Sequence, residues 1–188
     1  MKAIKNVTKA FIASLVLTVF AVAAVPTAAQ TVQPVSYEQV SKKVRKELVT
    51  LPYYGVFDNL AYNIEGGTVT LYGQVVRPST RKDAERRVRR IAGVTEVVNR
   101  IEVLPLSSFD DSIRVATYRT LYRTGGLYRY FMGANPSIHI VVNRGHVTLE
   151  GVVANEGDRR LANIAARGVP GAFSVTNNLR TDRDNGRY

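Results

Sequence analysis

The sequence contains no cysteine and no tryptophan, and only two of its 188 residues are histidine. Without cysteine the chain cannot form disulfides, thiolate metal sites or a thiol nucleophile. The two histidines are His139 and His146, and a zinc site normally needs three or four protein ligands. We therefore interpret both as surface residues and expect no metal or other cofactor.

A catalytic signature is also lacking. The stretch Ser79-Thr80-Arg81-Lys82 matches the Ser-x-x-Lys pattern of serine acyl enzymes, but the accompanying Ser-Asp-Asn and Lys-Thr-Gly elements do not occur. The serine directly follows Pro78, where a hydroxyl can cap a helix. We expect a protein that is not an enzyme.

Acidic residues are few beside basic ones, with 15 Asp and Glu against 26 Lys and Arg and a formal net charge of +11. Three lysines in the first nine residues precede an apolar run over residues 10–25, and small residues follow at 27–29. This order predicts a secretory signal peptide over residues 1–29. A retained membrane anchor is the alternative, although the run is shorter than the roughly 20 apolar residues of a spanning helix.

Removal of residues 1–29 takes away three lysines and leaves a net charge of +8. We expect the processed chain to be periplasmic or secreted, where anionic phospholipid surfaces and glycan phosphates are the abundant polyanions. Nucleic acid, the usual polyanion for a basic cytoplasmic protein, is not an expected partner.

An internal repeat is the most informative feature of the chain. The segment 67–75 (GTVTLYGQV) returns as 145–153 (GHVTLEGVV), and further matches continue at the same offset of 78 residues without a gap. A gapless repeat with helix-sized stretches between its matches predicts two copies of one small fold.

The first copy is predicted to run helix, strand, strand, helix, strand. Its first helix begins at Tyr37, and a hairpin turning at Gly66–Gly67 sets Ile64 opposite Val69 and Tyr62 opposite Leu71. A second helix follows Pro78, capped by Ser79 or Thr80, and a strand covers 97–103. The predicted buried helix positions are Tyr37, Val40, Val44, Leu48 and Leu51, then Ala84, Val88 and Ile91.

The second copy repeats this order. Its first helix is capped by Asp110, Asp111 or Ser112, carries Tyr118 and Tyr122 on its core stripe, and is interrupted at Gly125–Gly126. A hairpin over 138–154, a helix over 158–167 and a strand over 173–179 follow. If the second and third strands of a copy are parallel, the first strand is expected between them, as in a split β-α-β sheet.

The repeated Gly-x-Val-x-Leu-x-Gly-x-Val, followed by a helix with an inner alanine and then Gly-x-x-x-Val-x-Asn, resembles the BON domain. This family is named for bacterial osmotic-stress and nodulation proteins. The motif positions, interpreted as architectural, are Gly67, Gly73, Gly93 and Asn99 in the first copy and Gly145, Gly151, Gly171 and Asn177 in the second.

The resemblance implies an α+β fold with two BON domains, over 30–104 and 109–182. The residues after Thr181 are polar, and we expect a disordered tail over 183–188. Each domain is expected to be αββαβ, with a three-stranded mixed sheet and two helices on one face. The resemblance further implies an envelope protein that binds anionic phospholipid or membrane surfaces and supports envelope integrity under stress. The alternative is a periplasmic chaperone or scaffold for outer-membrane or other exported client proteins.

Two basic stretches are candidate lipid-binding sites, because tyrosine favours membrane interfaces and arginine pairs with phosphate. One interleaves aromatic residues with arginines, and the other is the arginine-rich second helix of the first copy. A solvated charged face is the alternative for both stretches. The candidate residues are Arg119, Arg123, Tyr128, Arg129 and Tyr130 in the first stretch and Arg86, Arg89 and Arg90 in the second.

Overall fold

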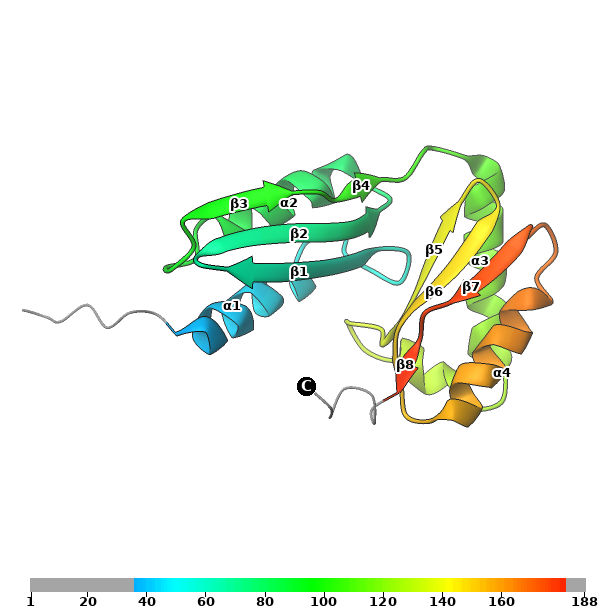
Figure 1. The fold of residues 1–188 in the computed structure, drawn as a ribbon. Coiled ribbons are helices and arrows are strands. Elements are labelled where there is room, and N and C mark those ends of the chain that lie inside the picture. Colours follow the sequence, from blue (N-terminus) through cyan, green and yellow to red (C-terminus); the bar gives the residue numbers. More distant parts are fainter. Residues whose placement is uncertain (1–35, 182–188) are drawn as a thin grey trace, which may run out of the picture. The chain divides into compact units, whose positions relative to one another are not determined.

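The computed structural model describes residues 36–181 (Figure 1). The predicted signal peptide over 1–29 and the predicted tail over 183–188 lie outside these residues. Within 36–181, no helix combines the length and apolar character needed to cross a membrane.

The two sequence copies fold as two αββαβ repeats, which confirms the predicted α+β class. The first contains α1 (Tyr37–Val49), β1 (Asn59–Glu65), β2 (Thr68–Val75), α2 (Pro78–Val88), β3 (Glu96–Asn99) and β4 (Glu102–Val103). The second contains α3 (Ser108–Arg123), the short 3-10 helix η1 (Leu127–Phe131), β5 (Ile138–Asn143), β6 (His146–Val153), α4 (Glu156–Arg167), β7 (Ser174–Asn177) and β8 (Arg180–Thr181).

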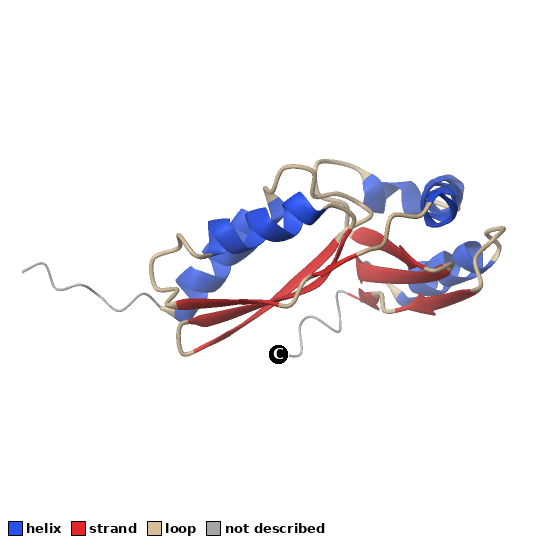
Figure 2. Ribbon diagram, turned by 90° about the horizontal axis from the view of Figure 1, so that it is seen from above, coloured by secondary structure: helices blue, strands red, loops and turns tan. Residues whose placement is uncertain are grey.

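In each repeat the second hairpin strand is the centre of the sheet. β1 pairs antiparallel with β2, whose other edge pairs parallel with β3 and β4; β5, β6, β7 and β8 repeat this pattern. The expectation that the first strand lies between the other two was therefore wrong. The helices of each repeat lie on one face of its sheet (Figures 1 and 2).

The hairpin register was predicted correctly. Ile64 pairs with Val69 and Tyr62 with Leu71, and the glycines of the Gly66–Gly67 turn both have positive φ. A two-residue turn with positive φ at both positions twists in the same sense as the strands that it joins. The second hairpin turns at residues 144–145, and its strands pair in the register of the first hairpin, at the offset of 78 residues.

An asparagine breaks the third strand of each repeat into two short strands. Asn99 donates a hydrogen bond from Nδ2 to the carbonyl of Arg81 (3.1 Å) and accepts one from the Ile101 N–H (3.1 Å). Asn177 makes the same two bonds, to Arg159 (2.9 Å) and from Leu179 (3.2 Å). The continuous strands predicted over 97–103 and 173–179 are therefore interrupted by an architectural motif residue.

The helix caps differ from those predicted. Arg77 precedes Pro78 at the start of α2 and makes no side-chain cap, while Thr80 is buried. The cap of α3 is Ser107, whose Oγ accepts from the Asp110 N–H (3.1 Å). Asp110 itself is buried and accepts hydrogen bonds from the N–H groups of Arg144 (2.9 Å) and Gly145 (2.7 Å). It therefore holds the β5–β6 turn against α3.

Each repeat has its own hydrophobic core. In the first, Val44, Leu71, Val75, Ala84 and Val88 are among the fully buried residues that join α1 and α2 to the sheet. Leu121, Ile140, Leu149 and Ala162 are buried at the corresponding interface of the second repeat. Tyr37 was predicted on the buried stripe of α1 but is exposed, because it is the first residue of the helix.

Candidate membrane-binding surfaces

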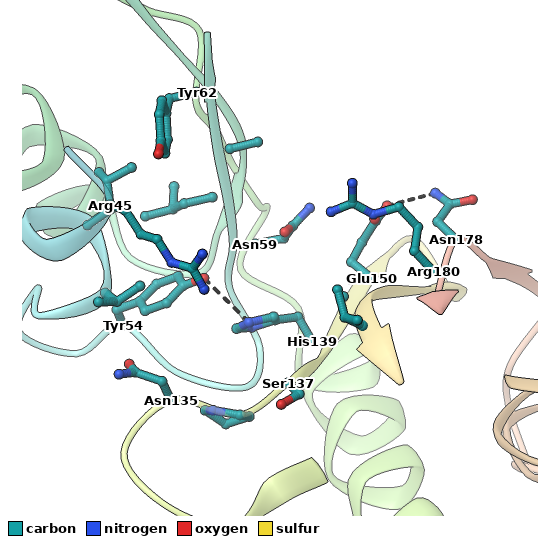
Figure 3. Close-up of a pocket in the computed structure, with 17 residues that line it drawn as sticks. Arg45, Tyr54, Asn59, Tyr62, Asn135, Ser137, His139, Glu150, Asn178 and Arg180 are labelled. Atoms are coloured by element: carbon teal, nitrogen blue, oxygen red, sulfur yellow. Dashed lines mark hydrogen bonds between the residues drawn. The ribbon is translucent and has the colours of Figure 1, made fainter. Parts of the chain in front are cut away.

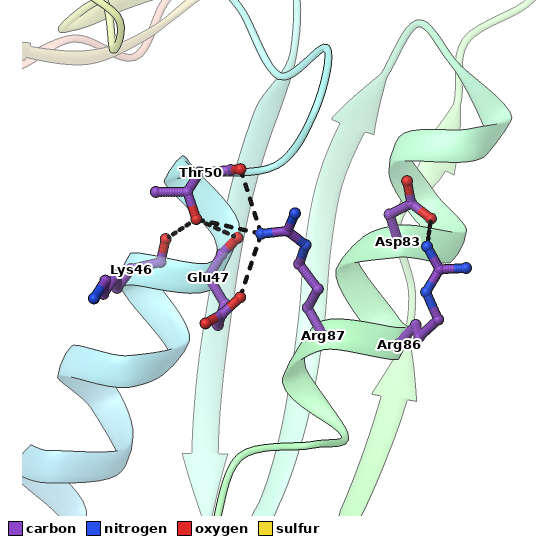
Figure 4. A network of polar contacts seen from close by, with 6 residues as sticks. All are labelled: Lys46, Glu47, Thr50, Asp83, Arg86 and Arg87. Carbon is purple, nitrogen blue, oxygen red and sulfur yellow. Dashed lines mark hydrogen bonds and ion pairs between the residues drawn. The ribbon is translucent and has the colours of Figure 1, made fainter.

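The helices of the first repeat form a basic layer. We use this name for α1, α2 and the two residues after α2, which together carry ten basic and four acidic side chains. Arg87 of α2 joins the helices, with Nη1 3.4 Å from both Glu47 Oε2 and Thr50 Oγ1 (Figure 4). The basic groups of two segments distant in the sequence therefore cover one face of the sheet.

Intrahelical ion pairs neutralise part of this layer. Arg86 pairs with Asp83 at 2.6 Å (Figure 4) and Arg89 with Glu85 at 2.5 Å. Lys82 and Arg90 are exposed and have no ion-pair partner within residues 36–181. With the two paired arginines and Glu85 they line a shallow hollow of about 430 Å³. Of the three candidate arginines, Arg90 has its full charge available to an external anion.

The second repeat brings tyrosines and arginines together at the end of α3. Arg119 and Arg123 lie one turn apart, are exposed and have no ion-pair partner in the described chain. Tyr122 and Tyr128 are 41% and 51% exposed, and their ring centroids are 6.4 Å apart. We call these four residues the tyrosine–arginine surface. Tyr122 was expected in the core, whereas the structure leaves its ring half in water.

Arg129 and Tyr130 have partners inside the protein. Tyr130 is only 8% exposed, and its hydroxyl donates to Asp158 (2.6 Å) and accepts from the Ala154 N–H (2.9 Å). Arg129 pairs with the same carboxylate at 2.5 Å and lies over the Tyr130 ring. These contacts connect η1 to the start of α4, so we leave both residues out of the tyrosine–arginine surface.

An exposed aromatic pair was missed in the sequence. Phe109 and Phe173 lie 5.7 Å apart between ring centroids, and Phe173 is 69% exposed. Phe173 follows the α4–β7 turn and occupies the position of Thr95 in the first repeat. Comparison of the two copies at their fixed offset could have identified it, since a large apolar residue replaces a small polar one at a turn.

His139 is not the surface residue that was expected. It is half-buried, its Nδ1 lies 3.2 Å from the Gly55 carbonyl, and its ring packs against Tyr54 at 5.5 Å between centroids. Because a carbonyl only accepts, Nδ1 carries the proton in this contact. Burial lowers the pKa of His139. His146 is exposed, as expected, and the described residues contain no cluster of His, Asp or Glu that could hold a metal ion.

Comparison with known families identifies both repeats. The BON domain profile matches residues 36–105 and 129–183, so the chain belongs to the BON domain family. Proteins of this family are generally non-enzymatic and associated with the envelope or periplasm, and the domain is linked to membrane and phospholipid binding in general. No curated protein matches the chain.

Two solved structures are similar at low identity. CdsD, a structural protein of the type III secretion system of Chlamydia trachomatis, is similar over 79% of this chain and 98% of its own, with 12% identity and a TM-score of 0.30. The C-terminal domain of CdsD is similar over 73% and 94%, with 11% identity and a TM-score of 0.27. At these values the likeness supports no functional conclusion.

Proposed function

We propose that this protein is a non-enzymatic envelope protein that binds anionic phospholipid surfaces through the tyrosine–arginine surface. The observation that carries the proposal is the exposure of Tyr122 and Tyr128 beside Arg119 and Arg123, which have no acidic partner in residues 36–181. Tyrosine rings suit the apolar margin of a membrane, and unpaired guanidinium groups suit lipid phosphate.

The basic layer adds a second, longer-range attraction. Each basic residue near an anionic leaflet contributes on the order of 1 kcal/mol, and the attraction falls off within a Debye length. The paired side chains Arg86 and Arg89 contribute less to this attraction than Arg90 and Lys82, because Asp83 and Glu85 already offset their charges. Membrane binding should therefore need anionic lipid and weaken with salt.

Co-sedimentation of the purified protein with liposomes tests the proposal. We expect binding to liposomes that contain phosphatidylglycerol and none to neutral phosphatidylcholine liposomes. Raising the salt from about 0.1 M to about 1 M shortens the Debye length from about 10 Å to about 3 Å and should release the protein. Equal sedimentation with both lipids, or no sedimentation with either, would contradict the proposal.

Charge reversal locates the surface. The double variant Arg119→Glu/Arg123→Glu should lose most anionic liposome binding. The matched control is Arg160→Glu/Arg167→Glu on α4, because this pair also consists of exposed arginines without an ion-pair partner in the described chain. Both variants lower the net charge equally, so equal losses would indicate a general charge effect and remove the tyrosine–arginine surface from the proposal.

A further inference from the structure

The first sheet ends in an edge strand, β1, whose outward main-chain groups can be assigned from the register. The carbonyls of Gly67, Leu71 and Val75 accept hydrogen bonds from the β3–β4 side of the sheet. The alternate residues of β2 therefore bond to β1, through Asn59, Ala61, Asn63 and Glu65. Leu60, Tyr62 and Ile64 consequently direct their N–H and C=O groups away from the sheet.

The equivalent edge of the second repeat is occupied. At the offset of 78 residues, Tyr62 corresponds to Ile140 and Ile64 to Val142. The Ile140 N–H donates to the carbonyl of Val56 (2.7 Å), and the Val142 carbonyl accepts from the buried Arg114 (2.6 Å). Side-chain and loop groups therefore satisfy outward main-chain groups of β5.

Within residues 36–181, no such cover is present on β1. The main-chain N–H and C=O groups of Tyr62 and Ile64 make no hydrogen bond with any residue from 36 to 181, although the Leu60 N–H meets the Tyr54 hydroxyl. With seven residues β1 is also the longest edge strand of the two sheets. It contains no lysine and no proline, two residues that commonly protect an exposed edge from pairing.

A cleft of about 1020 Å³ lies along this edge (Figure 3). One wall is formed by residues 59–62 of β1 and by Arg45 and Leu48 of α1. The other wall belongs to the second repeat and is formed by His139, residues 150–152 of β6 and Arg180. Residues 36–181 belong to one compact unit, so the open edge faces a defined space within that unit.

We propose that this cleft binds an extended polypeptide segment with acidic side chains, which adds to the first sheet as a strand beside β1. Strand addition obtains its affinity from main-chain hydrogen bonds and its selectivity from the alternate side chains of the ligand. Tyr62 supplies the central donor and acceptor, and Ile64 supplies the next pair along the strand. The segment extends the sheet of the first repeat without displacing a protein hydrogen bond at these two residues.

The charges of the cleft favour an acidic ligand. Arg45 and Arg180 are exposed and have no ion-pair partner in the described part of the chain. Glu150 is the acidic lining residue, and its Oε1 accepts a hydrogen bond from Asn178 Nδ2 (2.7 Å; Figure 3). Carboxylates of the ligand would pair with the two arginines, whereas a basic segment would meet repulsion on both walls.

A synthetic peptide tests this proposal directly. The probe is a fluorescein-labelled heptapeptide of alternating valine and glutamate, and its binding is measured by fluorescence anisotropy. We expect saturable binding, and a loss of at least about tenfold in affinity when lysine replaces each glutamate. Failure of the glutamate peptide to bind, or equal binding of both peptides, would overturn the proposal.

Methylation of the peptide amides distinguishes strand addition from charge attraction. In an antiparallel or parallel pair only alternate N–H groups of the added strand bond to the edge. Methylation of one alternate set of amides should abolish binding, and methylation of the other set should be tolerated. Equal tolerance of both sets would exclude main-chain pairing.

Hydrogen exchange in the unaltered protein locates the site without any substitution. The amide protons of Tyr62 and Ile64 should become protected when the glutamate peptide saturates the protein. Ile140 is the internal control, because its N–H already bonds to Val56 and should not change. Protection at other residues with none at Tyr62 and Ile64 would place the peptide elsewhere and overturn the proposal.

Two sets of variants complete the test. Tyr62→Pro removes the outward N–H, whereas Tyr62→Ala keeps it, so only the proline variant should lose binding by at least about tenfold, with retained folding checked by circular dichroism. The double variant Arg45→Glu/Arg180→Glu should reverse the preference and favour the lysine peptide. An unchanged preference would contradict the role of the two arginines. The peptide measurements contain no lipid, so their failure can be told apart from a failure of liposome binding, to which Arg45 contributes as part of the basic layer.

Discussion

The hydroxyl of Tyr130 donates a hydrogen bond to the carboxylate of Asp158 over 2.6 Å, although the two residues are 28 positions apart in the sequence. The same hydroxyl accepts the Ala154 N–H (2.9 Å), and the same carboxylate accepts from Asn155 Nδ2 (2.8 Å). Because η1 holds the β6–α4 connection through these bonds, a tyrosine that was predicted to touch lipid has a role within the fold.

Replacement of Tyr130 by phenylalanine tests this role. The variant removes the hydrogen bond to the Asp158 carboxylate and leaves the part-buried Ala154 N–H without its partner, and these two losses together cost about 1–3 kcal/mol. We expect the free energy of unfolding in urea to fall by that amount, while binding to anionic liposomes is unchanged. Tyr128→Phe is the control for stability and should leave the free energy of unfolding within about 0.5 kcal/mol, because Tyr128 is exposed and its hydroxyl makes no hydrogen bond in the described chain. A loss of liposome binding by Tyr130→Phe without a loss of stability would support the original prediction.

Asn177 connects the third strand of the second repeat to α4. Its Nδ2 donates to the Arg159 carbonyl, and its Oδ1 accepts from the Leu179 N–H. Asn177→Ala removes both bonds and should lower the free energy of unfolding by about 1–3 kcal/mol. The neighbouring Asn178→Ala should stay within about 0.5 kcal/mol, because Asn178 is exposed and, among residues 36–181, its side chain bonds only to the Glu150 side chain. Equal effects at the two positions would contradict the architectural role of Asn177.

Gly151 tests the close approach of two strands. A Cβ added there would lie 2.0 Å from the Ser137 carbonyl oxygen, and the φ of Gly151 is +120°. Gly73 has the same relationship to the carbonyl of Asn59, so the close approach of a neighbouring main-chain carbonyl requires both glycines. We expect Gly151→Ala to destabilise the second repeat by more than about 3 kcal/mol, because the main chain itself must move.

Thermal and urea unfolding measure this effect, and Gly55→Ala is the matched control. A Cβ at Gly55 meets no atom within 4 Å, so this variant should unfold like the unaltered protein. If Gly151→Ala unfolded at the same urea concentration as Gly55→Ala, the neighbouring main chain would have moved with little loss of stability. The close approach of the carbonyl would then not explain the repeated glycine.

Local patterns predicted the repeats, the hairpin register and the core positions of α2 because these depend on residues close in sequence. The order of the strands was not predictable in this way, since parallel pairing of β2 with β3 depends on how α2 crosses the sheet. The predicted cap of α3 was wrong for a related reason. The carboxylate of Asp110 could accept a hydrogen bond as a helix cap. It instead accepts from the N–H of Gly145, which lies far away in the sequence.

The candidate surfaces could likewise be predicted only in part from the sequence. Composition identified the aromatic and arginine-rich stretch, yet exposure within it depends on contacts from other elements. Tyr130 is buried because Asp158 and Ala154 meet its hydroxyl, whereas Tyr122 remains half-exposed. The open edge of β1 could not be predicted from the sequence, because it depends on whether other residues bond to the main chain of Tyr62 and Ile64. Among the described residues, none does.

His139 makes the stability of the fold depend on pH. Burial lowers its pKa, and the groups that face it are the Gly55 carbonyl, the Tyr54 hydroxyl and the carboxylates of Asp58 and Glu150. Burial also raises the pKa of Tyr54, to about 12, so this hydroxyl stays protonated at neutral pH and donates towards Nε2. A proton on Nε2 would remove the acceptor of this contact and place a charge in a half-buried position.

The direction of the pH effect follows from linkage. A histidine whose pKa is lower in the folded than in the unfolded protein contributes stability above the unfolded value of about 6.5, and this stability is lost as the pH falls through the folded value. Asp58 acts in the opposite direction, because burial raises its pKa from the ordinary value. The comparison is made between about pH 7.5 and about pH 5.5, the range around the ordinary histidine pKa of about 6.5.

Urea unfolding over this range should show a decline in the free energy of unfolding of the unaltered protein as the pH falls. In His139→Gln the decline should be absent, because glutamine keeps hydrogen-bonding groups but does not titrate. His146→Gln is the control and should keep the decline, since His146 is exposed and, within residues 36–181, its side chain hydrogen-bonds only to the Ser174 hydroxyl. A decline that persists unchanged in His139→Gln would mean that another group titrates, and that the contact between His139 and Gly55 does not couple protonation to folding.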